Sequence, residues 1–201
     1  MNKKIVIIDY GRGNLHSVHK ALKAVGANVG VSSDAAVIAA ADKLILPGVG
    51  AFGDCMSNLQ SYGLVPVIQE ALTAGKPFLG ICLGLQLLFE GSEEAPGVNG
   101  LGYFRGRVEK IRTELKIPHM GWNRLELRKP SVLLKNSADA YVYFVHSYHA
   151  VPADKEVITA VCGYGAEITA AVGRGTVQAV QFHPEKSSKA GLEILKAFKE
   201  W

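Results

Sequence analysis

The residue type with the clearest capacity for chemistry is a cysteine held between two glycines. Cys82 lies at the centre of Gly80–Gly84, a thiol version of the Gly-x-Ser-x-Gly turn that exposes a nucleophile between a strand and a helix. The glycines let neighbouring backbones pass close to a sharp and strained turn. A helix beginning within Leu85–Glu90 would place its positive end near the sulfur and favour the thiolate. A buried structural cysteine fits this local pattern equally well.

A second group of reactive side chains lies near the end of the chain, in Gln181–Glu185. His183 and Glu185 are two positions apart, with Pro184 stiffening the turn between them. An imidazole that moves the proton, oriented by a carboxylate, would serve a cysteine nucleophile. Taken alone, a His-x-Glu pair is more often a surface histidine beside an unrelated glutamate. No further ligands stand at metal-binding spacing, so we expect no metal site.

A glycine-rich loop, Pro47–Gly50, follows the apolar strand expected at Lys43–Leu46. Such a loop can direct backbone N–H groups at a developing anion. By itself, it is more often a flexible turn. Gly11 and Gly13 do not form a dinucleotide fingerprint, because His16 occupies the position of the third glycine.

The elements that must position these residues follow a βαβαβ rhythm in the first half of the chain. This rhythm predicts a parallel sheet with helices on both faces, and sites in such sheets gather at the carboxyl ends of the strands. After Glu90 we expect a loop over Ser92–Gly102, then short and mostly antiparallel strands, and a closing helix over Ser187–Phe198. The later strands are expected at Arg107–Ile111, Arg124–Leu127, Val142–Val145, Val157–Cys162, Ile168–Val172 and Thr176–Phe182.

Composition narrows the function classes. The chain has 201 residues, 48% hydrophobic and 20% charged, which predicts one soluble globular domain over 1–201. A net charge of +4 without a basic run does not indicate nucleic-acid binding. No apolar stretch approaches a membrane span or a signal peptide. The three cysteines are widely spaced, which fits the reducing cytoplasm.

Together, Gly80–Gly84 and Gln181–Glu185 resemble the signature of the triad, or class I, glutamine amidotransferases. The likeness extends over essentially the whole chain and narrows to the glutaminase subunits of imidazole glycerol phosphate synthase. The segments that carry it are Pro47–Gly50, Ser92–Gly97, Pro118–Asn123 and His183–Ser187. The resemblance implies an α/β, flavodoxin-like fold: a mixed, mostly parallel central sheet, helices on both faces, and additional antiparallel strands.

The resemblance also implies a role for each site residue. Cys82, His183 and Glu185 would be catalytic, with an oxyanion held by the N–H of Leu83 and one from Val49 or Gly50. The glutamine amino and carboxylate groups would be bound by Gln86, Glu94, Ser147 and Tyr148. The residues that would face a partner are Pro118, Met120, Trp122, Asn123 and Tyr143. No cofactor is implied.

The implied activity is hydrolysis of L-glutamine to glutamate and ammonia. The ammonia would pass to a cyclase subunit with a (β/α)₈ barrel, in a heterodimer of histidine biosynthesis. We expect low activity without the partner, because the Gly48–Gly50 segment can hold its N–H turned away. Three alternatives remain at this point: the glutaminase of another synthase such as pyridoxal phosphate synthase, a stand-alone thiol hydrolase or peptidase, and a non-catalytic regulatory subunit.

Overall fold

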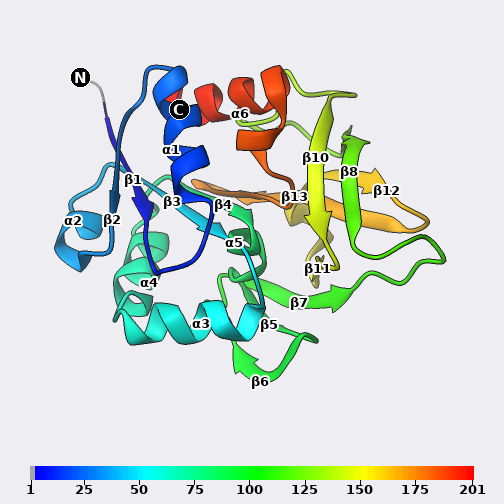
Figure 1. The fold of residues 1–201 in the computed structure, drawn as a ribbon, viewed down its shortest axis with the longest axis horizontal. Helices are drawn as coiled ribbons and strands as arrows, with labels where there is room; N and C mark the ends of the chain where they lie inside the picture. The colour runs from blue at the N-terminus through cyan, green and yellow to red at the C-terminus, as the bar shows by residue number, and fades with distance from the viewer. Residues whose placement is uncertain (1–2) are drawn as a thin grey trace.

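The architecture is organised around one mixed sheet of eight strands (Figure 1). The structure is a computed structural model that describes residues 3–201. In sheet order, the strands are β2 (Asn28–Ser32), β1 (Lys4–Ile8), β3 (Lys43–Gly48), β4 (Phe78–Cys82), β14 (Val177–Val180), β13 (Glu167–Arg174), β12 (Ile158–Gly163) and β9 (Glu126–Leu127). The pairs from β2 to β14 are parallel, and those from β14 to β9 are antiparallel. This arrangement confirms the predicted mixed sheet.

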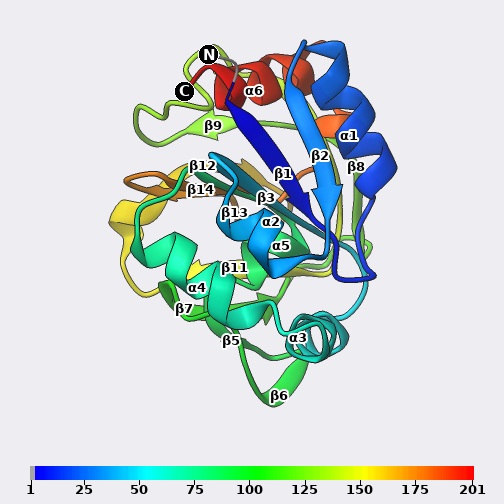
Figure 2. The same cartoon turned by 90° about the vertical axis from the view of Figure 1, so that its left-hand side faces the viewer.

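Helices cover both faces of the sheet, as predicted (Figure 2). On one face lie α1 (Leu15–Ala24) and α6 (Ser188–Glu200), whose apolar side chains pack with Ile5, Ile7 and Leu79. On the other face lie α2 (Ala35–Ala39), α3 (Phe52–Ser61) and α4 (Val65–Thr73). Asp34 caps α2, since its carboxylate accepts from the N–H groups of Ala36 and Val37.

A buried lysine connects the sheet to the last helix. Lys43, at the start of β3, is fully buried, and its ammonium donates to the carbonyls of Phe198 and Lys199 at 2.8 and 2.9 Å. These carbonyls belong to the last turn of α6, where free carbonyls and the helix dipole favour a cation. Burial lowers the pKa of Lys43 to about 8. The lysine therefore fixes α6 against β3.

Two smaller sheets extend the molecule beyond the eight-stranded one. A four-stranded sheet has the order β11 (Tyr148–Pro152), β7 (Phe104–Lys110), β5 (Phe89–Ser92) and β6 (Ala95–Asn99). A pair is formed by β8 (His119–Arg124) and β10 (Tyr141–His146). Most of these pairs are antiparallel, as predicted, but β5 and β7 are parallel. Within residues 3–201, no helix has the length and apolar character needed to cross a membrane.

The prediction for the segment after Cys82 was wrong in part. The helix expected to begin within Leu85–Glu90 is instead the four-residue α5 (Leu83–Gln86), and the chain is extended again from Phe89. Residues 87–89 are all buried apolar residues, a pattern that fits a buried strand as well as a helix. Because α5 has a single turn, its dipole contributes less at Cys82 than the sequence suggested.

The expected loop over Ser92–Gly102 was also wrong in part, because it contains β6. This strand pairs with β5 across a tight turn, with Ser92 opposite Ala95. Its residues are mostly exposed and include proline and glycine, so the sequence carried no strand signal. Likewise, Arg124–Leu127 is not one strand: β8 ends at Arg124 and β9 covers Glu126–Leu127, on either side of the buried Leu125.

Candidate active site

Cys82 occupies the sharp turn that the glycine pattern predicted. It ends β4 with a φ of 55° and a ψ of −110°, a backbone region that non-glycine residues rarely adopt. A Cβ on Gly84 would lie 1.8 Å from the carbonyl oxygen of Leu46, and one on Gly80 would lie 2.7 Å from that of Gly84. Both glycines are therefore required for α5 to pass against β3 and β4.

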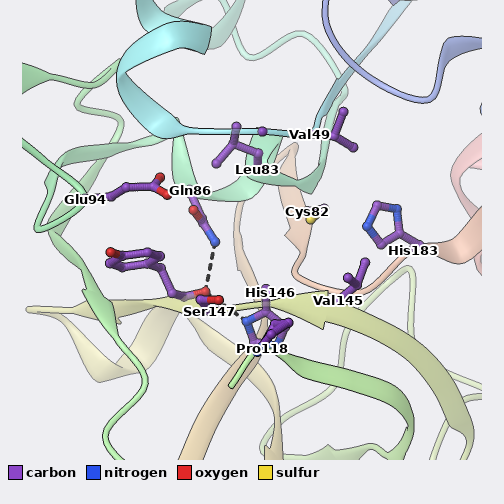
Figure 3. Close-up of a pocket in the computed structure, with 12 residues that line it drawn as sticks. Val49, Cys82, Leu83, Gln86, Glu94, Pro118, Val145, His146, Ser147 and His183 are labelled. Atoms are coloured by element: carbon purple, nitrogen blue, oxygen red, sulfur yellow. Dashed lines mark hydrogen bonds between the residues drawn. The ribbon is translucent and has the colours of Figure 1, made fainter. Parts of the chain in front are cut away.

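His183 and Glu185 form an ion pair inside the protein. Nδ1 of His183 lies 2.8 Å from Oε1 of Glu185, and the two side chains are 3% and 1% exposed. The amide of Asn14 also donates to Oε1 of Glu185, at 3.3 Å. Nε2 of His183 is buried without a hydrogen-bond partner and faces the Cys82 sulfur in Figure 3. The fold thus brings the three predicted catalytic side chains together.

The surroundings of His183 stabilise its cation. Burial alone would lower the pKa of His183, but interactions with the Cys82 sulfur and the Glu185 carboxylate outweigh burial and raise the pKa to about 10. The Glu185 carboxylate acts through its 2.8 Å contact with Nδ1, and the Cys82 sulfur acts on the other side of the ring, where a low dielectric constant strengthens the interaction. This arrangement favours the imidazolium form of His183.

The backbone around His183 is held by β10. The N–H of His183 donates to the carbonyl of Tyr143 at 2.9 Å, and the N–H of Tyr143 donates to Oγ of Ser187 at 3.0 Å. The same Ser187 hydroxyl donates to the carbonyl of His183 at 2.6 Å. Three hydrogen bonds therefore fix the turn that carries the imidazole.

The glycine-rich loop lies across from Cys82, and buried side chains hold its carbonyls. Gly48 is opposite Cys82 in the β3–β4 register. The Tyr10 hydroxyl donates to the carbonyl of Pro47 at 2.9 Å, and the Cys55 thiol donates to the carbonyl of Val49 at 3.5 Å. Burial raises the pKa of both Tyr10 and Cys55, so both keep their protons.

A cavity of about 350 Å³ opens beside Cys82, a size typical of small-molecule sites (Figure 3). Among the predicted residues, those that line it are Val49, Gly50, Cys82, Leu83, Gln86, Glu94, Pro118, Ser147, Tyr148 and His183. All three predicted oxyanion-hole residues and all four predicted glutamine contacts thus lie around one cavity. Glu185 does not line the cavity and contacts Nδ1 of His183, which does.

Two of the predicted glutamine contacts are themselves bonded to the protein. One carboxylate oxygen of Glu94 accepts from the N–H of Phe52, the first residue of α3, at 2.8 Å. The other oxygen retains the capacity to accept from a ligand ammonium group. Gln86 donates from Nε2 to the carbonyl of Tyr148 at 2.9 Å, the dashed line in Figure 3. Its side-chain oxygen retains the capacity to accept.

The predicted partner-facing residues separate into two groups. Met120 and Trp122 are 59% and 50% exposed on one face of β8, and the Trp122 ring meets Tyr143 edge-on with ring centres 6.2 Å apart. Pro118 instead lines the cavity. Asn123 is directed inward, donating to the carbonyl of Gly163 at 2.9 Å. An exposed aromatic surface therefore lies next to the cavity.

Sequence reasoning missed residues that contact the site. His146 lines the cavity, although no motif in the sequence marked it. Asn14 contacts Glu185, and Gln181 donates to the Cys82 sulfur at 3.7 Å. The Gly11–Asn14 turn and the position of Gln181 beside His183 were visible in the sequence, whereas the location of His146 depends on strand register.

This arrangement has the parts of an acyl-transfer site. A thiolate can attack a carbonyl carbon, an imidazolium can protonate the leaving group, and backbone N–H groups near Val49, Gly50 and Leu83 can bind the oxyanion. The cavity beside the sulfur is lined by Glu94, with a carboxylate suited to a substrate ammonium group. The geometry therefore suits hydrolysis of a small amide or ester that carries a positive charge.

The chain resembles known proteins along nearly its full length. The family model described as glutamine amidotransferase class-I matches residues 6–200. The chain is 50% identical over 196 residues to imidazole glycerol phosphate synthase subunit HisH of Methanothermobacter thermautotrophicus, covering 98% of each chain. It is 52% identical over 198 residues to the protein of the same name from Aquifex aeolicus, covering 98% of this chain and 96% of the relative.

Solved structures share the fold at lower sequence identity. A crystal structure described as a glutamine amidotransferase superposes with a TM-score of 0.76 at 20% identity, over 96% of this chain and 98% of that one. The structure of PurLQS from Thermotoga maritima gives 0.75 at 18% identity, over 98% of each chain. Both support the predicted fold class.

Proposed function

This chain belongs to the class-I glutamine amidotransferase family, and we propose that it is the glutaminase subunit of an imidazole glycerol phosphate synthase. The observation that carries the proposal is the Cys82–His183–Glu185 arrangement beside a cavity lined by Glu94. Support for this particular synthase comes from relatives of that name at about half identity over nearly the whole chain. The chain works as one glutamine amidotransferase domain over 1–201.

In the proposed reaction, the Cys82 thiolate attacks the side-chain amide carbon of glutamine. The resulting oxyanion is bound by the N–H of Leu83 and by one from Val49 or Gly50. Loss of one such donor costs on the order of 3–4 kcal/mol of transition-state stabilisation. His183 gives its proton to the departing nitrogen, so that ammonia leaves and a thioester remains.

Water completes the cycle. The now neutral imidazole of His183 takes a proton from water, which attacks the thioester carbon and releases glutamate and the thiolate. Glu185 keeps Nδ1 of His183 protonated and stabilises the imidazolium. Gln86, Glu94, Ser147 and Tyr148 hold the amino and carboxylate groups of the substrate. Over the whole cycle, glutamine and water give glutamate and ammonia, and the enzyme returns to its starting state.

The ammonia passes to a cyclase subunit with a (β/α)₈ barrel, which docks on the surface of Met120, Trp122 and Tyr143. Asn123 and Pro118 lie behind this surface, and Pro118 connects it to the cavity. Near neutral pH, free ammonia in water is mostly ammonium, which has no lone pair for attack. A sealed route from the cavity into the partner keeps the product reactive.

The deciding experiment measures glutamine hydrolysis by the purified chain, with and without the cyclase subunit of the same organism and its nucleotide ligand. We expect glutamate release to rise strongly when both are added. Glutamate release that ignores the cyclase would favour a stand-alone thiol hydrolase. Stimulation by the pyridoxal phosphate synthase barrel instead of the cyclase would assign the chain to that synthase.

A further inference from the structure

Two buried histidines outside the triad lie side by side, and one of them, His146, lines the cavity. His119 on β8 and His146 at the end of β10 are paired directly in the strand register. They are 2% and 6% exposed, and Nδ1 of His119 lies 3.0 Å from Nε2 of His146. The acyl-transfer steps use neither side chain. A buried pair of ring nitrogens at this distance requires one donor and one acceptor.

The outer end of the pair fixes which nitrogen carries each proton. Asn123 accepts the N–H of Arg124 at its side-chain oxygen, at 2.8 Å, and donates from Nδ2 to the carbonyl of Gly163 at 2.9 Å. Its amide therefore has one orientation. The remaining Nδ2 hydrogen points to Nε2 of His119, at 3.2 Å. Nε2 of His119 must accept, so Nδ1 of His119 carries the proton and donates to His146.

The inner end of the pair gives the same assignment independently. Nδ1 of His146 lies 2.9 Å from the carbonyl oxygen of Tyr148. A carbonyl only accepts, so Nδ1 of His146 carries a proton, and its Nε2 accepts from His119. Both imidazoles are then neutral. This agrees with burial, which lowers the pKa of His119 to about 4 and that of His146 to about 3.

The chain of hydrogen bonds continues to the nucleophile. The carbonyl of Tyr148 also accepts from Nε2 of Gln86, at 2.9 Å. The second hydrogen of that amide goes to Oε1 of Gln181, at 3.0 Å, and the Gln181 amide donates to the Cys82 sulfur at 3.7 Å. Gln86 and Gln181 are 3% and 0% exposed, so water does not compete for these bonds.

We propose that His119 and His146 are positioning residues for the Cys82 sulfur. Both imidazoles are neutral and have a fixed tautomer, and His146 donates to the Tyr148 carbonyl. That carbonyl accepts from Gln86, which donates to Gln181, and Gln181 donates to the Cys82 sulfur. The inference rests on the proposed glutaminase function. Its outer end, Asn123, lies on the strand that carries the proposed partner surface.

Alternative substitutions of His146 separate positioning from packing. His146→Leu fills similar space but removes the donor to the Tyr148 carbonyl. His146→Asn places an amide N–H near the former Nδ1 and keeps that donor. His149→Leu is the matched control. Burial also lowers the pKa of His149, on β11, to about 4, and Nδ1 of His149 accepts a hydrogen bond from the N–H of Thr169.

The measurement is alkylation of Cys82 by the glutamine-like diazoketone 6-diazo-5-oxo-L-norleucine, in the complex with the cyclase subunit and its nucleotide ligand, followed by mass spectrometry of the full chain. Its saturation kinetics separate binding from attack. For His146→Leu, we expect the limiting alkylation rate to fall about tenfold, the scale of one hydrogen bond to a charged group. The half-saturating diazoketone concentration of His146→Leu should change less than threefold. His146→Asn should recover most of the alkylation rate, and His149→Leu should match the wild type. Thermal melts show that each variant is folded.

The proposal is overturned if His146→Leu reacts at the wild-type rate, if only the half-saturating concentration changes, or if His149→Leu loses as much. It is also overturned if His146→Asn recovers nothing while remaining folded. Failure of the proposed function gives a different result: wild-type Cys82 would react with iodoacetamide but not with the diazoketone. In that case, iodoacetamide rates for the same variants decide the inference, since a displaced sulfur is slower with any electrophile.

Discussion

The amide of His183 donates a hydrogen bond to the carbonyl of Tyr143, so the proposed base of the site is supported by a residue whose side chain lies beside the exposed Trp122. The strand that carries this carbonyl, β10, is therefore a support for His183 as well as part of the proposed partner surface. Its Ser187 contacts complete the support.

Replacing Ser187 with alanine tests this support. Ser187→Ala removes the hydroxyl that accepts from Tyr143 and donates to the carbonyl of His183, leaving buried backbone groups unpaired. We expect a loss of about 1–3 kcal/mol in stability and a fall in kcat with KM for glutamine little changed. Steady-state kinetics and urea unfolding measure the two effects. An unchanged kcat would show that the turn is held without the hydroxyl.

Cys82→Ala separates the two half-reactions. The substitution removes the proposed nucleophile but leaves the proposed partner surface, which lies on β8 and β10. Glutamine-dependent synthesis by the complex should disappear, and synthesis with added ammonium salts at alkaline pH should persist. Product formation with each nitrogen source is the measurement. Equal loss of both activities would contradict the proposed division of labour.

Cys55→Ala tests whether the buried thiol positions the oxyanion loop. The Cys55 thiol holds the Val49 carbonyl, so its removal should loosen the loop and lower kcat by up to about tenfold, less than the loss of an oxyanion donor. Cys55→Ser keeps a donor and should recover activity. The control is Cys162→Ala, which removes a buried thiol from β12. If both alanine variants lose the same activity, the effect is general packing.

Buried neutral histidines should make the protein sensitive to acid. Burial lowers the pKa of His119 and His149 to about 4 and that of His146 to about 3, against 6.5 in the unfolded chain. The unfolded state thus binds more protons below pH 6.5. The contribution of these histidines to the free energy of unfolding is fully present above pH 6.5. It is lost as the pH falls toward 4, by about 1.4 kcal/mol per pH unit for each histidine.

Urea unfolding between pH 7 and pH 4 measures this dependence, and His149→Gln should reduce its slope. His149 is the suitable choice because it lies outside the chain of bonds that leads to Cys82. A slope identical to that of the wild type would mean that His149 binds protons equally in the folded and unfolded states, so that its pKa is not lowered by folding.

Trp122→Ala tests the partner surface. Trp122 is 50% exposed, so its removal should change the free energy of unfolding by less than about 0.5 kcal/mol. If the Trp122 ring is an anchor for the cyclase, the affinity of the Trp122→Ala variant for the cyclase should fall by at least tenfold. Tyr62→Ala, at an aromatic position 48% exposed at the end of α3, is the control. Calorimetric titration compares them, and equal affinities for both variants would remove Trp122 from the interface.

The parts of the site that the sequence predicted are those set by local geometry. Gly80 and Gly84 flank Cys82 because added Cβ atoms would meet backbone within 3 Å. The spacing of the two glycines around the cysteine shows this steric requirement in the sequence itself. His183 and Glu185 lie on one stiff turn, so their 2.8 Å contact needs little from the rest of the chain. The apolar strands β1, β3 and β4 were recognisable for the same local reason.

What the sequence could not predict depends on pairing between distant segments. His146 meets His119 only because β8 and β10 adopt one register, and a shift of one residue would direct their side chains to opposite faces. Strand β6 is exposed and exists through its pairing with β5. Asn14 reaches Glu185 across most of the chain's length.

The position of β14 between β4 and β13 has a consequence for synthesis of the protein. A nascent chain leaving the ribosome presents Cys82 long before Val177–Val180 exist to flank its strand. Until residues 177–183 have been made, the Cys82 sulfur lacks both the neighbouring strand and the imidazole of His183, so a shorter nascent chain cannot carry out the proposed hydrolysis. Because β14 is made late and lies next to β4, the site can form only after both halves of the chain have been synthesised.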